Sequence, residues 1–213
     1  MTRFTDLTDA AISVVAEHGM RGLTHRAVDA RAALPIGTTS AYFRTRKALI
    51  EALVRRLADL DNADVAARAL PPPAEPDPGD FADAVAQVLD RWLTVGRDRT
   101  LARYACLLEA THHPELRTIL EYGRASREQA RALLAAAGVP DPDQAGGHFV
   151  ACVDGLLFDR IAGAGALTAP PPGTPENRAD LATAVRHLLA GFTSATATRS
   201  ISRSDSRRPP SSG

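Results

Sequence analysis

Apolar residues recur along the chain at the spacing of helix faces. Leu7, Ala11, Val14 and Val15 lie at i, i+4, i+7 and i+8, which places them on one side of a first helix. The same periodicity returns from Leu49 onward and again in several segments of the C-terminal half. Because no segment shows a convincing alternation of apolar and polar residues, the pattern predicts an all-α protein of about nine helices.

The N-terminal part is predicted to hold three short helices followed by a longer one. Thr24 is expected to cap the second helix, and the tight sequence LPIG at 34–37 separates it from a third helix over 38–43. Thr45 is expected to cap a fourth helix that runs to about Leu70. Helices of this length, joined by short turns, are the parts of a helix-turn-helix unit.

Proline and glycine divide the rest of the chain. Five prolines within 71–80 cannot continue a helix, because proline lacks the N–H donor, so this stretch is predicted to be a stiff connector. Amphipathic segments follow, then a Pro/Gly-rich loop over 164–175 and a last helix over 176–192. The Ser/Arg/Pro-rich tail at 195–213 has almost no large apolar residue and is predicted to be disordered.

Charge is unevenly distributed in this chain of 213 residues, although the formal net charge is zero. Residues 1–56 contain nine basic and five acidic side chains, a net charge of +4, which leaves −4 for the remainder. Such asymmetry indicates an N-terminal part that meets a polyanion, although short segments often differ by a few charges.

The sequence also indicates where the protein works. The N-terminus has no apolar run of the kind found in a secretory signal, and no apolar stretch is long enough to span a membrane. Cys106 and Cys152 are the only cysteines, and both lie in apolar helical surroundings. We therefore expect no disulfide framework and a reducing, cytoplasmic location.

The turn and third helix carry small hydroxyls, an aromatic pair and cations within ten residues. A recognition helix places its N-terminal residues in a major groove roughly 12 Å wide, where small hydroxyls bond to bases or phosphates and arginines to phosphates. Ile36, Thr39 and Phe43 are also expected to face the core of the unit. The predicted DNA-contacting residues are Thr24, His25, Arg26, Thr38, Thr39, Ser40, Ala41, Tyr42, Arg44, Arg46 and Lys47. Taken singly, each is more often structural, as a helix cap for example, and only their combination favours DNA.

The segment GLTHRAVDARAALPIGTTSAYFRTRKALIEAL resembles the DNA-binding half of TetR-family transcriptional regulators. The matching features are the glycine-led turn into the second helix, Gly37-Thr38 opening the third, and Tyr42-Phe43 closing it. The resemblance implies a nine-helix homodimer that binds a palindromic double-stranded DNA operator and a small-molecule effector. It divides the chain into a DNA-binding domain at 1–50, a linking helix at 46–70, and an effector-binding and dimerisation domain at 71–194.

Effector and dimer contacts are expected in the C-terminal domain. An effector pocket is mostly apolar with a few placed polar groups, and Arg103, if buried, would need an anion. The candidate lining residues are Trp92, Arg103, Tyr104, Leu107, Leu108, Tyr122, Phe149 and Cys152. The candidate dimer residues are Gly155, Leu156, Leu157, Leu181, Val185, Leu188 and Leu189. In both sets, packing within the chain's own domain is the alternative.

Motifs for other chemistry are missing from the sequence. There is no HExxH, CxxC, GxSxG or phosphate-cradling glycine loop, so we expect no catalytic residue, metal or cofactor. The expected function is a ligand-responsive transcriptional regulator, most simply a repressor released from DNA by a small molecule. A small all-α enzyme or ligand carrier is the alternative, and activation instead of repression stays open.

Overall fold

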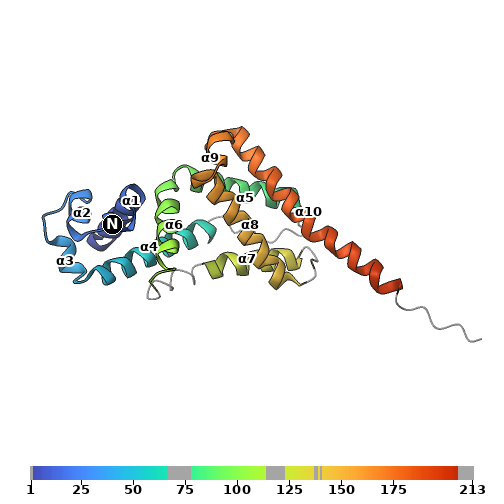
Figure 1. Cartoon of the computed structure of the whole chain (residues 1–213), viewed down its shortest axis with the longest axis horizontal. Coiled ribbons are helices and arrows are strands. Elements are labelled where there is room, and N and C mark those ends of the chain that lie inside the picture. Colours follow the sequence, from blue (N-terminus) through green and yellow to red (C-terminus); the bar gives the residue numbers. More distant parts are fainter. Residues whose placement is uncertain (1, 67–77, 114–122, 137–138, 140, 206–213) are drawn as a thin grey trace, which may run out of the picture.

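The protein is built from successive α-helices in the computed structural model, which describes residues 2–66, 78–113, 123–136, 139 and 141–205. No strand occurs among these residues, so the all-α prediction is confirmed. The helices are α1 (Arg3–Gly22), α2 (His25–Arg31), α3 (Thr38–Tyr42), α4 (Arg46–Ala66), α5 (Pro78–Leu93), α6 (Arg97–Glu109), α7 (Gly123–Ala136), α8 (Pro142–Ala162), α9 (Gly165–Thr168) and α10 (Pro175–Asp205). Figure 1 shows α2 and α3 at one end of an elongated molecule, and α10 extending at the other.

The first core lies among α1, α2, α4 and α6. The predicted face of α1 is buried there, with Leu7 and Ala11 fully enclosed, and Leu53 of α4 packs into the same core. Ala102 and Cys106 of α6 also belong to it, so α6 packs on the N-terminal helices although it follows the predicted connector. The two halves of the chain therefore share a helix instead of being joined only through α4.

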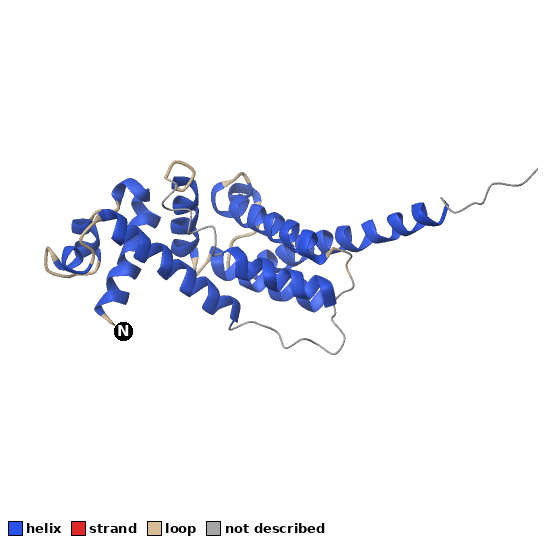
Figure 2. Ribbon diagram, turned by 90° about the horizontal axis from the view of Figure 1, so that it is seen from below, coloured by secondary structure: helices blue, strands red, loops and turns tan. Residues whose placement is uncertain are grey.

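The second core lies among α5, α7, α8 and α10. Leu89 of α5, Phe149 and Leu157 of α8, and Leu181 and Val185 of α10 are buried in it. Helix α7 packs on α8, and α10 packs mainly on α5. Figure 2, seen from below, shows the long C-terminal helix extending away from the other helices of this half. This second core holds together the helices of the C-terminal half of the chain.

Capping residues set several helix starts where the sequence predicts them. The Thr24 hydroxyl accepts a hydrogen bond from the Ala27 amide at 3.1 Å at the start of α2. Thr45 does the same for the Ala48 amide at 3.1 Å at the start of α4. The predicted end of the fourth helix near Leu70 falls outside the described residues.

The predicted connector and the predicted tail both contain helix. Helix α5 begins at Pro78, inside the stretch expected to be a connector, because proline is tolerated in the first turn, where its missing N–H is not needed. Helix α10 continues to Asp205, so the prediction of disorder from residue 195 is wrong as far as this point. The helix can continue past residue 195 because no proline or glycine occurs within 192–208. Within the predicted loop at 164–175, α9 adds a short helix.

Candidate nucleic-acid interface and effector site

A sharp turn brings α3 across the end of α2. Gly37 has a φ of 96°, in the left-handed region that favours glycine, and it directly precedes α3. The Gly37 amide donates to the Asp29 carboxylate of α2 at 2.8 Å. The Thr39 amide and hydroxyl also donate to Asp29, at 2.7 and 2.5 Å. One buried carboxylate therefore fixes the start of α3 against α2.

Hydrogen bonds decide the ionisation of Asp29. Burial by itself would raise the pKa of this carboxyl group, but the hydrogen bonds from Thr39 and Gly37 outweigh burial and hold the pKa below its ordinary value. Thr39 is fully buried as a result, which confirms its predicted inward direction and corrects its place among the DNA-contacting residues. Sequence reasoning missed Asp29, because nothing local distinguishes it from an exposed helical aspartate.

The outer face of the turn and α3 is open to solvent. Ser40, Ala41 and Tyr42 of α3 are exposed, and so are Arg44 and Lys47, which follow them in the sequence. Thr38 is half-buried, and its hydroxyl donates to the Pro35 carbonyl at 2.7 Å.

Ile36 departs from its predicted inward position. Its side chain is 79% exposed, because the turn that Gly37 permits directs residue 36 outward. Phe43 does face the core, as predicted, where it packs edge-on against Phe4 with ring centroids 5.3 Å apart.

Two of the predicted DNA-contacting residues also hold the unit together. His25 lies 2.6 Å from the Phe43 carbonyl, measured from Nε2, which ties α2 to the end of α3. The Arg46 guanidinium donates to the Met20 carbonyl at 2.6 Å, although its side chain remains exposed overall. Thr24 is engaged as a cap, whereas Arg26 is exposed.

Three of the predicted effector-lining residues converge between α5, α6 and α8. The Arg103 guanidinium carbon lies 4.9 Å from the centroid of the Trp92 ring and 5.2 Å from that of Tyr104. The Tyr104 hydroxyl is 3.1 Å from both the backbone carbonyl and a carboxylate oxygen of Asp154. Burial, together with the Asp154 charge, raises the pKa of Tyr104 well above its ordinary value, so its hydroxyl stays protonated and donates.

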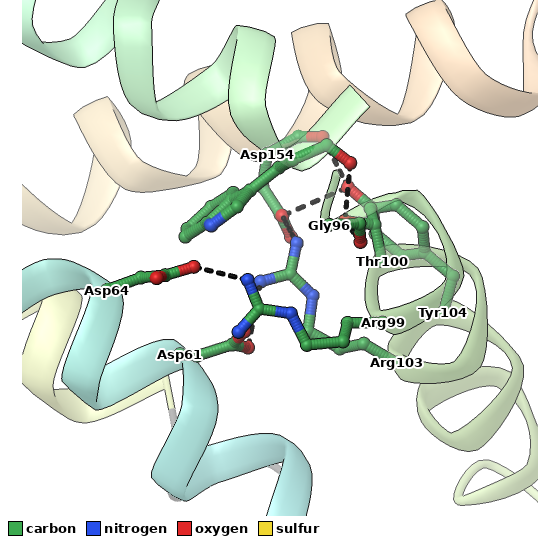
Figure 3. A network of polar contacts seen from close by, with 9 residues as sticks. Asp61, Asp64, Gly96, Arg99, Thr100, Arg103, Tyr104 and Asp154 are labelled. Atoms are coloured by element: carbon green, nitrogen blue, oxygen red, sulfur yellow. Dashed lines mark hydrogen bonds and ion pairs between the residues drawn. The ribbon is translucent and has the colours of Figure 1, made fainter. Parts of the chain in front are cut away.

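Acidic residues that sequence reasoning missed complete this cluster. Arg103 lies between Asp61 of α4, at 3.4 Å, and Asp154 of α8, at 3.5 Å, and Arg99 pairs with Asp64 of α4 (Figure 3). Burial raises the pKa of Asp61, and the positive charge of Arg103 offsets this only in part. The signal available in the sequence was the helical spacing of the charges. Asp61 and Asp64 lie three residues apart on α4, and Arg99 and Arg103, which face them, lie four residues apart on α6.

The remaining predicted effector residues are dispersed. Leu107 packs toward the first core, and the side chain of Leu108 is 63% exposed. Phe149 is buried in the second core, 5.7 Å from Phe81 between ring centroids. Cys152 is exposed on α8, and Tyr122 lies outside the described residues. Leu107 and Phe149 separate because α6 and α8 contribute them to different cores, whereas Leu108 and Cys152 face solvent.

Most of the predicted dimer residues are used within the chain. The fully or largely buried ones belong to the second core, so they are not available to a partner, and they are Leu157, Leu181, Val185 and Leu189. Leu156 and Leu188 are half-buried. Gly155 is exposed, and a side chain added there would meet nothing within 4 Å.

Two features are absent from the described residues. No helix among them is long and apolar enough to cross a membrane. They contain no group of three or more His, Cys, Asp or Glu side chains that could hold a metal ion.

Comparisons with known proteins agree with this arrangement. The family model for bacterial regulatory proteins of the tetR family matches residues 7–53, and that for the tetracyclin repressor-like C-terminal domain matches residues 76–191. A search of curated proteins found no match.

Solved structures similar to the chain span nearly its full length. A transcriptional regulator from Rhodococcus sp. Rha1 is 25% identical, with a TM-score of 0.71, over 91% of this chain and 97% of that one. A TetR-family member from Streptomyces coelicolor A3 is 31% identical, with a TM-score of 0.62, over 86% and 95%. The multidrug binding protein EbrR, complexed with ethidium, is 31% identical, with a TM-score of 0.59, over 86% and 95%.

The helix-turn-helix unit and the helical C-terminal half define a DNA-binding transcriptional regulator. The chain belongs to the TetR family.

Proposed function

We propose that this protein is a repressor that binds a palindromic DNA operator as a dimer of two identical chains. A small molecule that binds in the C-terminal half releases the dimer from the operator. The observation that carries the proposal is the exposed row of Ser40, Ala41 and Tyr42 on α3, held in place from behind by Asp29. Small side chains on a recognition helix allow close approach to base edges in the major groove.

The DNA contacts follow from exposure. Ser40 and Ala41 face the bases, and the exposed Ile36 lies where an apolar side chain can contact a thymine methyl group. Tyr42, Arg44 and Lys47 contact phosphates, which position the protein but carry little sequence information. Arg46 and His25 act mainly as positioning residues, since each has a short hydrogen bond to a backbone carbonyl.

A dimer places two recognition helices on successive major grooves. The half-sites of such an operator are roughly 34–36 Å apart, one turn of DNA. Gly155 on α8 supports the assembly, because its open surface lets a partner helix approach closely. The buried leucines of α8 and α10 keep these two helices rigid within each copy.

An effector in the C-terminal half is supported by the similarity to EbrR. That multidrug binding protein is known in complexes with imidazole, ethidium, proflavin and malachite green. In the present chain, α4 begins beside the helix-turn-helix unit of α2 and α3, here called the recognition unit, and carries Asp61 and Asp64 near its other end. A ligand that binds near these two residues can therefore move α3. Coupling between two such sites is typically about 1–3 kcal/mol.

Binding to the intergenic DNA beside the gene tests the proposal. We expect a specific complex whose affinity falls steeply with salt, as phosphate contacts require. Lys47→Ala should weaken binding to all sequences and lower the slope of log affinity against log salt by about one. Arg131→Ala, which removes ion pairs with Glu128 of α7 and Asp143 of α8 in the C-terminal half, should change neither quantity. Equal binding of intergenic and unrelated DNA would contradict a specific regulator.

A further inference from the structure

Arg103 occupies a cage made of two aromatic rings and two carboxylates. Its guanidinium lies over the Trp92 ring at 4.9 Å and beside the Tyr104 ring at 5.2 Å. Asp61 and Asp154 flank it from α4 and α8 (Figure 3). The faces of aromatic rings are electronegative, so rings and carboxylates together form a binding site for a positive charge. In the chain as it stands, the charge that fills the site is the protein's own.

The contacts that hold Arg103 in the cage are incomplete. Charge-assisted N–H···O hydrogen bonds are usually about 2.7–2.9 Å long, whereas the two contacts of Arg103 measure 3.4 and 3.5 Å. The buried Nε–H of Arg103 has no acceptor among the described residues. In water all five N–H donors of the side chain would be satisfied. Moving the guanidinium into solvent therefore costs less than breaking an ordinary buried ion pair.

The side of the cage formed by α8 is open to solvent. The Asp154 side chain is 46% exposed. Phe158, which packs edge-on against Tyr104 at 5.1 Å, is also exposed. The exposed Phe158 ring and the Tyr104 ring that it contacts therefore border this side of the cage. A flat aromatic molecule that approaches from α8 can contact an aromatic ring there.

We propose that the effector is an aromatic cation that displaces the Arg103 guanidinium from Trp92, Tyr104, Asp61 and Asp154. This inference rests on the proposed function and specifies the class of molecule that the protein senses. The ion pair between Arg103 and Asp61 joins α6 to α4. Displacing Arg103 breaks this ion pair with α4, the helix that begins beside the recognition unit. The Arg99–Asp64 ion pair still joins α6 to α4.

An anionic effector fits the same site poorly. Arg103 already has two carboxylates beside it, so its charge is compensated within the chain. An incoming anion would meet Asp61, Asp64 and Asp154, and each like charge would oppose its binding.

The charge of the ligand can be tested on the wild-type, full-length protein without DNA. The probes are proflavin, which is a planar cation, acridine, which has the same rings without the charge at neutral pH, and anionic fluorescein. Trp92 is the only tryptophan in the chain, so quenching of its fluorescence reports binding at the cage. We expect proflavin to bind at least about ten-fold more tightly than acridine, and fluorescein to bind more weakly still. Equal affinities for the three probes would overturn the proposal.

Variants separate displacement from simple contact. Arg103→Gln should tighten proflavin binding about ten-fold, since the competing cation is gone, whereas Asp61→Asn and Asp154→Asn should each weaken it by a similar factor. Arg186→Gln, which breaks an exposed ion pair with Asp83, is the matched control and should leave affinity unchanged. Circular dichroism verifies that each variant folds. Loss of proflavin binding in folded Arg103→Gln would overturn the proposal, because it would make Arg103 a ligand contact.

Release from DNA is measured with tetraphenylphosphonium, because planar dyes themselves intercalate into DNA. We expect this cation to release the protein from its specific DNA, and triphenylphosphine oxide, its neutral analogue, to have at least ten-fold less effect. Specific DNA binding that no cation changes, with no proflavin binding to the free protein, would overturn the cation proposal and leave the regulator intact. Proflavin binding without specific DNA binding would support the cage and contradict the regulator.

Discussion

Asp29 of α2 is buried and Asp61 of α4 is partly buried, yet the protein holds the two carboxylates differently. Asp29 accepts three hydrogen bonds of 2.5–2.8 Å, two of them from backbone amides of the turn and α3. Asp61 meets the Arg103 guanidinium at 3.4 Å. The pKa of Asp29 lies below its ordinary value, and that of Asp61 above it.

The difference follows from the kind of donor. Backbone N–H groups at a helix start are fixed by the fold and cannot move away from a carboxylate. An arginine side chain has several rotatable bonds and loses considerable rotamer freedom when it is held. The recognition unit is therefore built as a rigid reader of DNA. The contact between α4 and α6 is built so that its groups can exchange partners.

Removing the Asp29 carboxylate gives the largest expected effect. Asp29→Ala leaves the amides of Gly37 and Thr39 without their acceptor, and should lower the free energy of unfolding by about 3 kcal/mol. Urea unfolding followed by circular dichroism measures it. Asp59→Ala, at an exposed position of α4, is the control and should stay within about 0.5 kcal/mol of the wild type. If both variants unfold alike, Asp29 does not fix the recognition unit.

A pair of neighbouring residues on α3 sharpens the comparison. Thr39→Val keeps the shape of the buried side chain but removes one hydrogen bond to Asp29, and should cost about 1 kcal/mol in unfolding free energy. Ser40→Ala, at the next and exposed position, should leave stability unchanged and alter DNA binding instead. Unfolding curves and DNA titrations of both variants provide the measurements. A reversed result, with stability lost at Ser40, would place α3 the other way round.

The smallest effect expected is a difference in how stability depends on pH. The lowered pKa of Asp29 adds stability above the ordinary aspartate value of about 3.9, and this is lost as pH falls through the folded-state pKa. The raised pKa of Asp61, which Arg103, Arg99 and Asp64 surround, works the other way. Its ionisation costs stability as pH rises from about 3.9 to the folded-state pKa.

Asparagine variants isolate the two contributions. The stability advantage of the wild type over Asp29→Asn should shrink as pH falls below about 4, and its difference from Asp61→Asn should decline as pH rises above that value. Urea unfolding at a series of pH values measures both. Differences that change in the same direction would show that the two carboxylates are held alike.

Local sequence signals predicted the helices and the recognition unit well. Thr24 and Thr45 cap helices because their hydroxyls reach amides only three residues away. Gly37 precedes α3 because glycine adopts the positive φ that the turn requires. These interactions lie within a few residues, so the sequence records them directly. The end of α10 was misjudged because a Ser/Arg-rich composition lowers hydrophobicity without breaking a helix.

The effector half was predicted less well, because its contacts join distant segments. Trp92, Arg103 and Tyr104 did converge, but the carboxylates that complete their cage come from 42 and 51 residues away from Arg103. Leu157 and Leu189 have the periodicity of an interface and of a core alike, and only packing assigned them to the core.

The sequence by itself determined the helical architecture, the position of the turn before α3 and the family, because periodicity, caps and glycine act over short distances. Only the tertiary structure decided that Thr39 faces Asp29, that Ile36 faces solvent, and that Arg103 lies between two aromatic rings and two carboxylates. These outcomes depend on which helices pack together. Packing selects one partner for each buried charge from many that the sequence would allow.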